Sequence, residues 1–259
     1  PTPSVCPGCE RGCSVNIWHR RPEWKLNALD PRRNASIDRV TPLDNPAVNG
    51  PWICNKGRDL AKIFERPRAE QALLKGKPAE LAEAMARARD LLAEAKRPVA
   101  LVSSWGSNEE LEAFKAMLGS RFTCFVKHDA VPSPGEVIED AVLIKPDKNP
   151  NRRAAEALFG SAPISFPEGA DLVLVWGEGF NFAGLPRGAQ VIFLNSYLQP
   201  ENGHADVFLP ISVQTERSGH YTNFEGTVSE FRACFGKKAG VADAAEVFAA
   251  LATRERVAA

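Results

Sequence analysis

The sequence predicts an α/β fold in two parts: a small amino-terminal domain of short strands and a larger domain in which strands alternate with helices. Residues 1–66 are rich in Pro, Asn, Arg and Cys, and their short strand-like pieces lie between turn signals. From residue 79 onward, continuous apolar runs typical of buried parallel strands alternate with segments of helical periodicity. Such alternation implies right-handed crossovers and a Rossmann-like parallel sheet covered by helices.

The composition is that of a globular protein with its own core. The 259 residues include 32 Lys+Arg and 32 Asp+Glu, and 44% are hydrophobic. A formal net charge of zero provides no global field to hold nucleic acid, so we expect no nucleic-acid partner. No run approaches the roughly 20 apolar residues that a membrane-spanning helix needs, so we expect no direct membrane insertion.

The first domain, residues 1–66, has few apolar residues with which to build a core. Its candidate strands are short, at 14–18 and 39–40, and turn signals such as Pro7-Gly8 interrupt the chain. A bound metal group would supply the missing stabilisation, because metal binding contributes directly to folding free energy. Residues 67–78 are polar and are predicted to be a linker to the second domain.

The second domain, residues 79–259, starts with an amphipathic helix at 79–96, whose apolar positions keep helical spacing. Ser107 and the acidic residues after it predict the cap of a second helix, which Gly119 ends. The other predicted elements are buried strands at 99–102, 122–126, 171–176, 190–194 and 206–209, and a final helix at 242–252.

Four of the six cysteines crowd toward the amino end, at Cys6, Cys9, Cys13 and Cys54. Three thiolates from one tight loop and a fourth from a distant loop suit the corners of a cubane cluster. Zinc also binds four thiolates, but structural zinc sites usually pair two short knuckles, and here the fourth cysteine stands alone. We therefore predict one [4Fe-4S] cluster, with zinc and free thiols as the alternatives.

Several other residues have simpler interpretations. Cys124 and Cys234 lie far from the cluster motif, and we predict both to be small buried hydrophobes. Trp52, close to Cys54, is expected to shield the site from water. The Gly177-Glu178-Gly179 segment is predicted to be a strand-to-loop turn, because no glycine follows at dinucleotide-binding spacing. The histidines share no short ligand spacing and are expected to be surface or hydrogen-bonding residues: His19, His128, His204 and His220.

The four cysteines and their flanking residues resemble the iron-sulfur domain of the molybdopterin oxidoreductase superfamily. Within it, the sequence is most similar to the large G subunit of bacterial NADH:quinone oxidoreductase, or complex I. The resemblance spans nearly the whole chain. The segments that carry it are Val5–Cys13, Asn45–Asn49, Trp52–Arg58, Ser104–Glu110, Leu143–Asn151, His204–Pro210, Glu216–Gly219 and Thr222–Gly226.

The resemblance implies an iron-sulfur electron-transfer or structural subunit of an NADH-oxidising, quinone-reducing complex. Its partners would be the NADH-binding flavin subunit and other iron-sulfur subunits. The chain would be cytoplasmic and held at the inner membrane only through these partners. Lys56 resembles the lysine that lies between cluster and pterin in catalytic relatives. Without a pterin, we expect Lys56 to offset the negative charge of a thiolate-ligated cluster.

The sequence also departs from the family. The ferredoxin-like domain of the G subunit does not precede the cysteines, so we expect a fragment or a natural split. Between Arg58 and Val99 no residue resembles the molybdenum ligand of catalytic relatives, and the closing carboxy-terminal domain is missing. We therefore expect no molybdopterin and no catalytic residues in this chain. The alternative is a fragment of a formate-dehydrogenase-like molybdenum or tungsten oxidoreductase, and a further alternative is a zinc-stapled scaffold.

Overall fold

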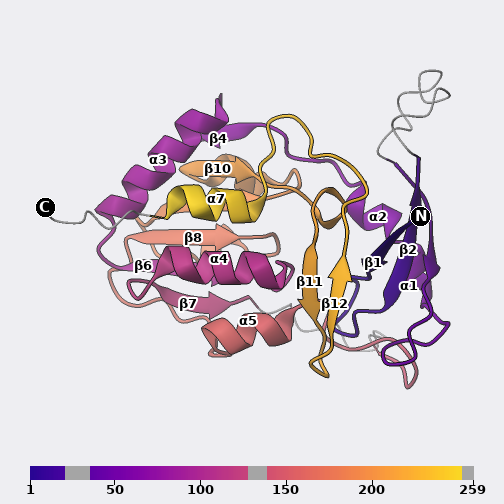
Figure 1. Ribbon diagram of the computed structural model, residues 1–259. Helices are drawn as coiled ribbons and strands as arrows, with labels where there is room; N and C mark the ends of the chain where they lie inside the picture. Colours follow the sequence, from indigo (N-terminus) through magenta and orange to yellow (C-terminus); the bar gives the residue numbers. More distant parts are fainter. Residues whose placement is uncertain (21–35, 128–138, 253–259) are drawn as a thin grey trace, which may run out of the picture. The chain divides into compact units, whose positions relative to one another are not determined.

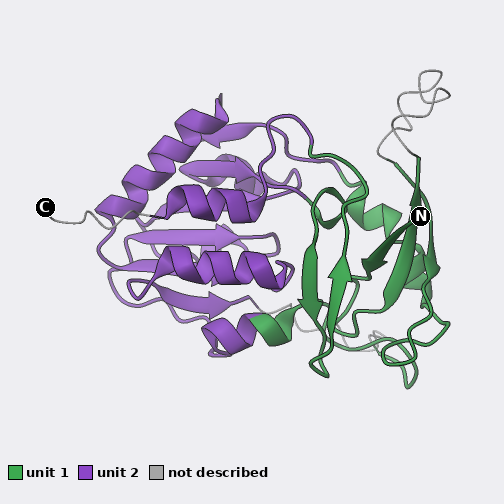
Figure 2. Cartoon of the chain, viewed as in Figure 1, with its two compact units in different colours: residues 1–66, 128–154, 213–237 green, residues 67–127, 155–212, 238–259 purple. Residues whose placement is uncertain are grey.

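The chain divides into two compact units in the computed structural model, which describes residues 1–20, 36–127 and 139–252 (Figure 1). Unit 1 comprises residues 1–66, 128–154 and 213–237, and unit 2 comprises residues 67–127, 155–212 and 238–259 (Figure 2). The expected continuous domains therefore differ from the observed units, because two later segments join the amino-terminal part. His128 lies outside the described residues.

Unit 1 is built on small antiparallel sheets. Its first sheet has the order β1-β2-β3, and its second is the hairpin β11-β12. A core cluster of Val5, Tyr221 and Phe231 is formed by side chains from both ends of the sequence. The elements are β1 (Thr2–Val5), β2 (Ser14–His19), β3 (Ile37–Pro42), α1 (Asn55–Arg58), α2 (Ala61–Phe64), η4 (Gln214–Glu216), β11 (Gly219–Thr222) and β12 (Val228–Phe231).

Unit 2 contains a seven-stranded, mostly parallel sheet with the order β5-β4-β10-β9-β8-β6-β7. Strands β7, β6, β8, β9 and β10 run parallel, as the buried apolar runs predicted. Their order is that of the flavodoxin-like doubly wound sheets. The strands are β4 (Ala72–Leu74), β5 (Lys77–Ala79), β6 (Pro98–Val102), β7 (Thr123–Val126), β8 (Leu172–Trp176), β9 (Gln190–Asn195) and β10 (Val207–Pro210).

The segment expected to be a linker belongs to this sheet. β4 pairs antiparallel with β10, and β5 pairs antiparallel with β4. Lys75 and Gly76, both at positive φ, connect β4 to β5 and allow Leu74 to pair with Lys77. A tight two-residue hairpin therefore lies at the edge of the sheet where the sequence analysis placed a polar connection.

Helices α3 (Leu81–Glu94), α4 (Asn108–Leu118) and α7 (Ala244–Leu251) lie over one face of the sheet, as Figure 1 shows. The Phe114 ring lies 4.6 Å from the Phe248 ring and 5.1 Å from the Trp176 ring, which joins two helices to the sheet. Ser107 caps its helix as expected, because its Oγ accepts a hydrogen bond from Glu110 N at 3.2 Å. The described residues also form the helices α5 (Arg152–Phe159) and α6 (Pro200–His204).

The opposite face of the sheet buries a separate cluster that includes Val99, Val173 and Phe193. Ile164, Phe166, Phe180 and Leu185 pack against this cluster, and all four lie outside the α-helices. A short 3-10 helix, η3 (Phe182–Gly184), is the regular element of that region. The expected helical covering is therefore observed on one face, whereas aromatic side chains from connecting segments help to cover the other. Over the described residues, no helix is both long and apolar enough to cross a membrane.

Candidate metal centre

Three of the four clustered cysteines lie on the loop that joins β1 to β2. Cys6 follows β1 directly and Cys13 comes just before β2, so pairing of Val5 with Ser14 brings the two ends of the loop together. Cys6 N donates a hydrogen bond to Cys13 O at 2.8 Å, which closes the loop. The strand pairing thus converts the C-x2-C-x3-C spacing into three thiols on one tight turn.

The fourth cysteine, Cys54, is the N-cap residue of α1. Its Sγ accepts a hydrogen bond from Gly57 N at 3.4 Å. Asn49 holds the loop before it, because its Nδ2 donates to Trp52 O at 2.9 Å and to Gly50 O at 3.0 Å. Cys54 is therefore presented by a hydrogen-bonded loop at the start of a short helix.

All four cysteines line one small cavity within unit 1. Lys56 lines it as well, so the structure brings together every residue that the sequence analysis selected for the site. The full set of lining residues is Cys6, Gly8, Cys9, Cys13, Ile53, Cys54, Lys56, Gly57, Leu143, Ile144 and Lys148.

Sequence reasoning missed the wall formed by Leu143, Ile144 and Lys148. These residues belong to a segment that resembled the family, but no ligand spacing tied them to the cysteines. Apolar side chains on this wall limit water access, and burial of this kind helps to set the potential of a bound cluster. Lys148 adds a second cationic side chain to the lining beside Lys56.

Two glycines of the lining leave room close to the thiols. A Cβ at Gly8 would lie 3.4 Å from Cys6 Sγ, and a Cβ at Gly57 would lie 3.6 Å from the same atom. A Cβ at Gly57 would also lie 2.5 Å from Ile53 Cγ1, which is too close for any side chain. Glycine at both positions therefore leaves space beside the Cys6 sulfur, and a group bound to the thiols would need that space.

Two of the thiols, Cys6 and Cys13, are electrostatically unfavourable as thiolates without a bound cation. Burial raises the pKa of Cys6 far above its usual range, and the neighbouring cysteines raise it further. Burial, with the charges of Cys9 and Cys54, raises the pKa of Cys13 to about 12. A metal group would reverse this preference, because metal ligands are deprotonated and the metal charge compensates them. The donor set therefore fits a thiolate-ligated group.

In the described part of the chain, no group of three or more His, Cys, Asp or Glu residues is arranged to hold a metal ion. The four cysteines are brought together as residues that line the same cavity.

The expectation that Trp52 shields the site is wrong. Trp52 is 64% exposed and is not among the residues that line the cavity. Its backbone carbonyl is bound by Asn49, which fixes the main chain of the loop while the ring lies outside. Ile53 and the wall at Leu143 and Ile144 supply apolar surface in its place.

The other two cysteines lie apart from the cavity lining. Cys234 is buried, as predicted, and burial raises its pKa to about 11. Cys124 lies in β7 as predicted but is only half-buried, because β7 is the edge strand of the sheet. Burial is nevertheless the main cause that raises the pKa of Cys124.

The turn at Gly177 and Gly179 is a strand-to-loop turn held within unit 2. Both glycines have positive φ, and Lys127 Nζ donates a hydrogen bond to Glu178 O between them. A Cβ at Gly177 would lie 2.7 Å from Ser103 Oγ. Close packing against the neighbouring strand end therefore explains why this position is glycine.

The cysteine motif lies in a segment that matches a known family model. Residues 1–66 match the molybdopterin oxidoreductase Fe4S4 domain. This match includes all four clustered cysteines, and it supports the resemblance to the molybdopterin oxidoreductase superfamily and an iron-sulfur cluster. The comparison with curated proteins gives no match.

The chain is also similar to solved structures, one of which aligns over much of its length. This structure is the formyltransferase/hydrolase complex from Methylorubrum extorquens in complex with methylofuran, at 13% identity and a TM-score of 0.41. The alignment covers 70% of this chain and 97% of the matched chain. A likeness this weak carries no argument about function.

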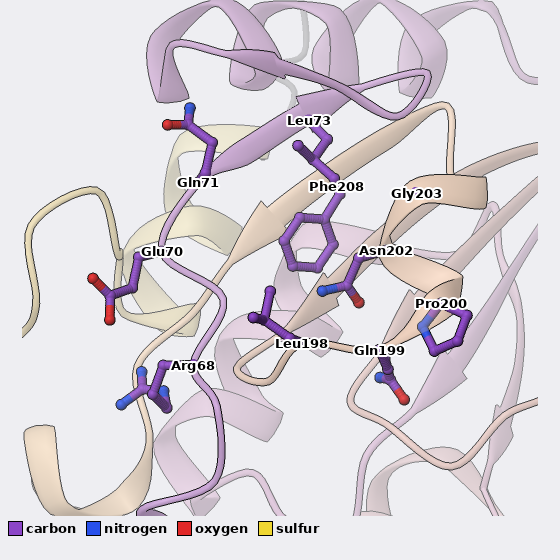
Figure 3. Close-up of a pocket in the computed structure, with 10 residues that line it drawn as sticks. All are labelled: Arg68, Glu70, Gln71, Leu73, Leu198, Gln199, Pro200, Asn202, Gly203 and Phe208. Carbon is purple, nitrogen blue, oxygen red and sulfur yellow. The ribbon is translucent and has the colours of Figure 1, made fainter.

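A second cavity, of about 730 Å³, lies in unit 2. Figure 3 shows Leu73 and Leu198 close to the Phe208 ring, with the side chain of Asn202 beside them. Asn202 Nδ2 donates to Tyr197 O at 3.0 Å, while its buried Oδ1 has no partner among the described residues. The residues that line this cavity include no cysteine or histidine, and it is separate from the candidate metal centre.

Proposed function

We propose that this chain is an iron-sulfur subunit in which Cys6, Cys9, Cys13 and Cys54 hold one [4Fe-4S] cluster. The observation that carries the proposal is the convergence of these cysteines on one cavity, within residues that match an Fe4S4 domain. Such a cluster, when bound, supplies one-electron transfer. The protein itself supplies the thiolates, an apolar wall and two lysines that offset negative charge.

The wider role follows from the resemblance to the G subunit of complex I. We infer that the chain is an electron-transfer or structural subunit of an NADH-oxidising, quinone-reducing complex, without a molybdenum site of its own. Its partners would be flavin and iron-sulfur subunits, and these would hold it at the cytoplasmic side of the inner membrane.

The cluster is tested by anaerobic purification followed by metal and sulfide analysis. We expect a brown protein with about four irons per chain and broad absorbance near roughly 400 nm that dithionite bleaches. A colourless protein with one zinc per chain would instead establish the zinc scaffold.

The role in a complex is tested by affinity purification of the tagged chain from its native host. We expect flavin and further iron-sulfur chains to co-purify and the preparation to reduce ferricyanide with NADH. Stoichiometric molybdenum or tungsten with formate-dependent dye reduction would establish the enzyme alternative. Purification of the cluster-loaded chain without partners would contradict the subunit role and leave the cluster assignment intact.

A further inference from the structure

Arg11 lies on the hairpin loop between the second and third clustered cysteines and joins that loop to two other segments of unit 1. Its Nε donates a hydrogen bond to Leu143 O at 2.8 Å. Its Nη1 donates a second hydrogen bond to Val48 O at 2.9 Å. Leu143 lines the cysteine cavity, and Val48 belongs to the loop that leads to Cys54. One guanidinium therefore connects all three segments that surround the cavity.

The segment that contains Leu143 forms a wall of the cavity through Leu143, Ile144 and Lys148. It turns tightly before the wall, because the Asp140 carboxylate accepts hydrogen bonds from Leu143 N at 2.6 Å and Ile144 N at 2.9 Å. A backbone hydrogen bond of 2.9 Å from Glu10 N to Asp147 O provides a second connection to the hairpin loop. The side chain of Arg11 thus binds the wall at Leu143, a residue that lines the cavity.

Further contacts fix Arg11 itself. Its backbone carbonyl accepts a hydrogen bond from Asn223 Nδ2 at 3.2 Å. Its guanidinium carbon lies 5.6 Å from the centroid of the Phe224 ring, and Lys145 Nζ lies 4.6 Å from the same centroid. The planar fork of arginine suits such a position, because it binds two carbonyls and stacks on an aromatic ring at once.

Arg11 also places a positive charge on the loop that carries three of the thiols, two residues from both Cys9 and Cys13. A positive charge at this position therefore favours added negative charge on the sulfur ligands.

We propose that Arg11 is a positioning residue of the cluster site, which holds the Leu143–Lys148 wall over the cavity and favours the reduced state by its fixed charge. The inference rests on the proposed function, because both effects concern a bound cluster. Reduction adds one electron to a site that already carries four thiolates, so a nearby cation stabilises the reduced form more than the oxidised form. The wall acts separately, by limiting access of water and chelators to the ligands.

Three substitutions in the full chain separate the two effects: Arg11→Met, Arg11→Lys and the control Arg232→Met. Lysine keeps the charge but cannot form the fork, and methionine loses both. Arg232 is exposed, pairs with Glu230 and is not among the residues that line the cavity, so its loss removes the same charge from unit 1. The measurements are the midpoint potential, the rate of iron loss to a chelator and amide hydrogen exchange over residues 139–151.

We expect Arg11→Met to lower the midpoint potential by about 59 mV, which is tenfold in the one-electron equilibrium constant. Arg11→Lys should keep the potential of the parent. Both Arg11 variants should lose iron several-fold faster than the parent, and their amide hydrogens should exchange faster over residues 139–151. Arg232→Met should match the parent in all three measurements. If Arg11→Met does not load iron, the rates of iron loss and amide hydrogen exchange in Arg11→Lys still test whether Arg11 holds the wall in place.

Two results would overturn the inference. A potential for Arg11→Met equal to that of Arg232→Met would exclude the effect of charge. Unchanged iron loss and exchange in Arg11→Lys would exclude the wall. A parent chain that binds no iron would overturn the proposed function itself, whereas a loaded parent with unchanged variants would overturn only the role of Arg11.

Discussion

Asn49 Oδ1 accepts a hydrogen bond of 2.8 Å from Ser14 N, and this contact ties the loop that leads to Cys54 to the strand that follows Cys13. Asn49 is 6% exposed, and its Nδ2 donates to carbonyls on its own loop. One buried side chain therefore sets the position of the distant fourth thiol relative to the other three. The gap between the cysteine motifs is bridged by a specific hydrogen-bond network.

The first prediction concerns this network. Asn49→Ala leaves buried backbone groups without partners, and we expect it to destabilise unit 1 by about 2–4 kcal/mol, since each unsatisfied group costs about 1–3 kcal/mol. Iron content should fall, as measured by metal analysis of anaerobically purified protein. Asn45→Ala is the matched control, because Asn45 Nδ2 contacts the same strand residue through Ser14 Oγ at 2.9 Å. Equal iron content in both variants would contradict the role of Asn49.

The second prediction couples the cluster to the folding of unit 1. Cys9→Ser or Cys54→Ser should lose iron and expose unit 1 to proteases, because metal binding is part of the folding free energy of a segment with few apolar residues. Cleavage should occur in residues 1–66 and in the later segments 139–154 and 213–237. Unit 2, which has its own core, should survive as large fragments on a gel.

A matched control for this prediction is Cys124→Ser. Cys124 lies in β7 of unit 2, so its substitution should leave iron content unchanged. Identical proteolysis patterns for Cys54→Ser and the parent chain would show that cluster binding and folding are not coupled.

The sequence predicted the features that are encoded by residues close together in the chain. The spacing of Cys6, Cys9 and Cys13 indicates a ligand loop, and continuous apolar runs indicate the buried parallel strands. Leu143 and Lys148 could not be assigned to the site in this way, because they line the cysteine cavity through tertiary contacts such as the hydrogen bond from Arg11 to Leu143 O. The same reason explains why residues 213–237 were expected in the second domain, since strand pairing across the whole sequence has no local pattern.

The misassigned linker did contain a usable signal. Lys75-Gly76 follows the apolar residues Leu73 and Leu74, and glycine at the second position of a two-residue loop is typical of a hairpin. The strands on either side are only three residues long, so their periodicity was too short to detect. The exposure of Trp52 had no such signal, because aromatic residues beside a buried site usually pack against it.

The third prediction tests the close packing beside the cluster ligands. A Cβ at Gly57 would lie 2.5 Å from Ile53 Cγ1, so Gly57→Ala should displace Ile53 and the adjacent Cys54, and lower iron content. Gly236→Ala is the matched control in unit 1, because nothing lies within 4 Å of a Cβ at Gly236. Ile53→Ala removes the atoms that clash, so the double substitution should recover iron relative to Gly57→Ala. Failure of this rescue would show that the glycine is needed for another reason.

The last prediction concerns unit 2, where the core and not a metal supplies stability. A Cβ at Gly106 would lie 2.2 Å from Trp176 Cη2, and this ring packs against Phe114 and Phe248. Because the ring cannot move without disturbing the helices, Gly106→Ala should cost about 1–3 kcal/mol, the usual range for overpacking a core. Gly203→Ala is the control, since nothing lies within 4 Å of its Cβ. Thermal unfolding of the two variants should therefore differ by several degrees while iron content stays the same, and equal midpoints would contradict the packing of Gly106 against Trp176.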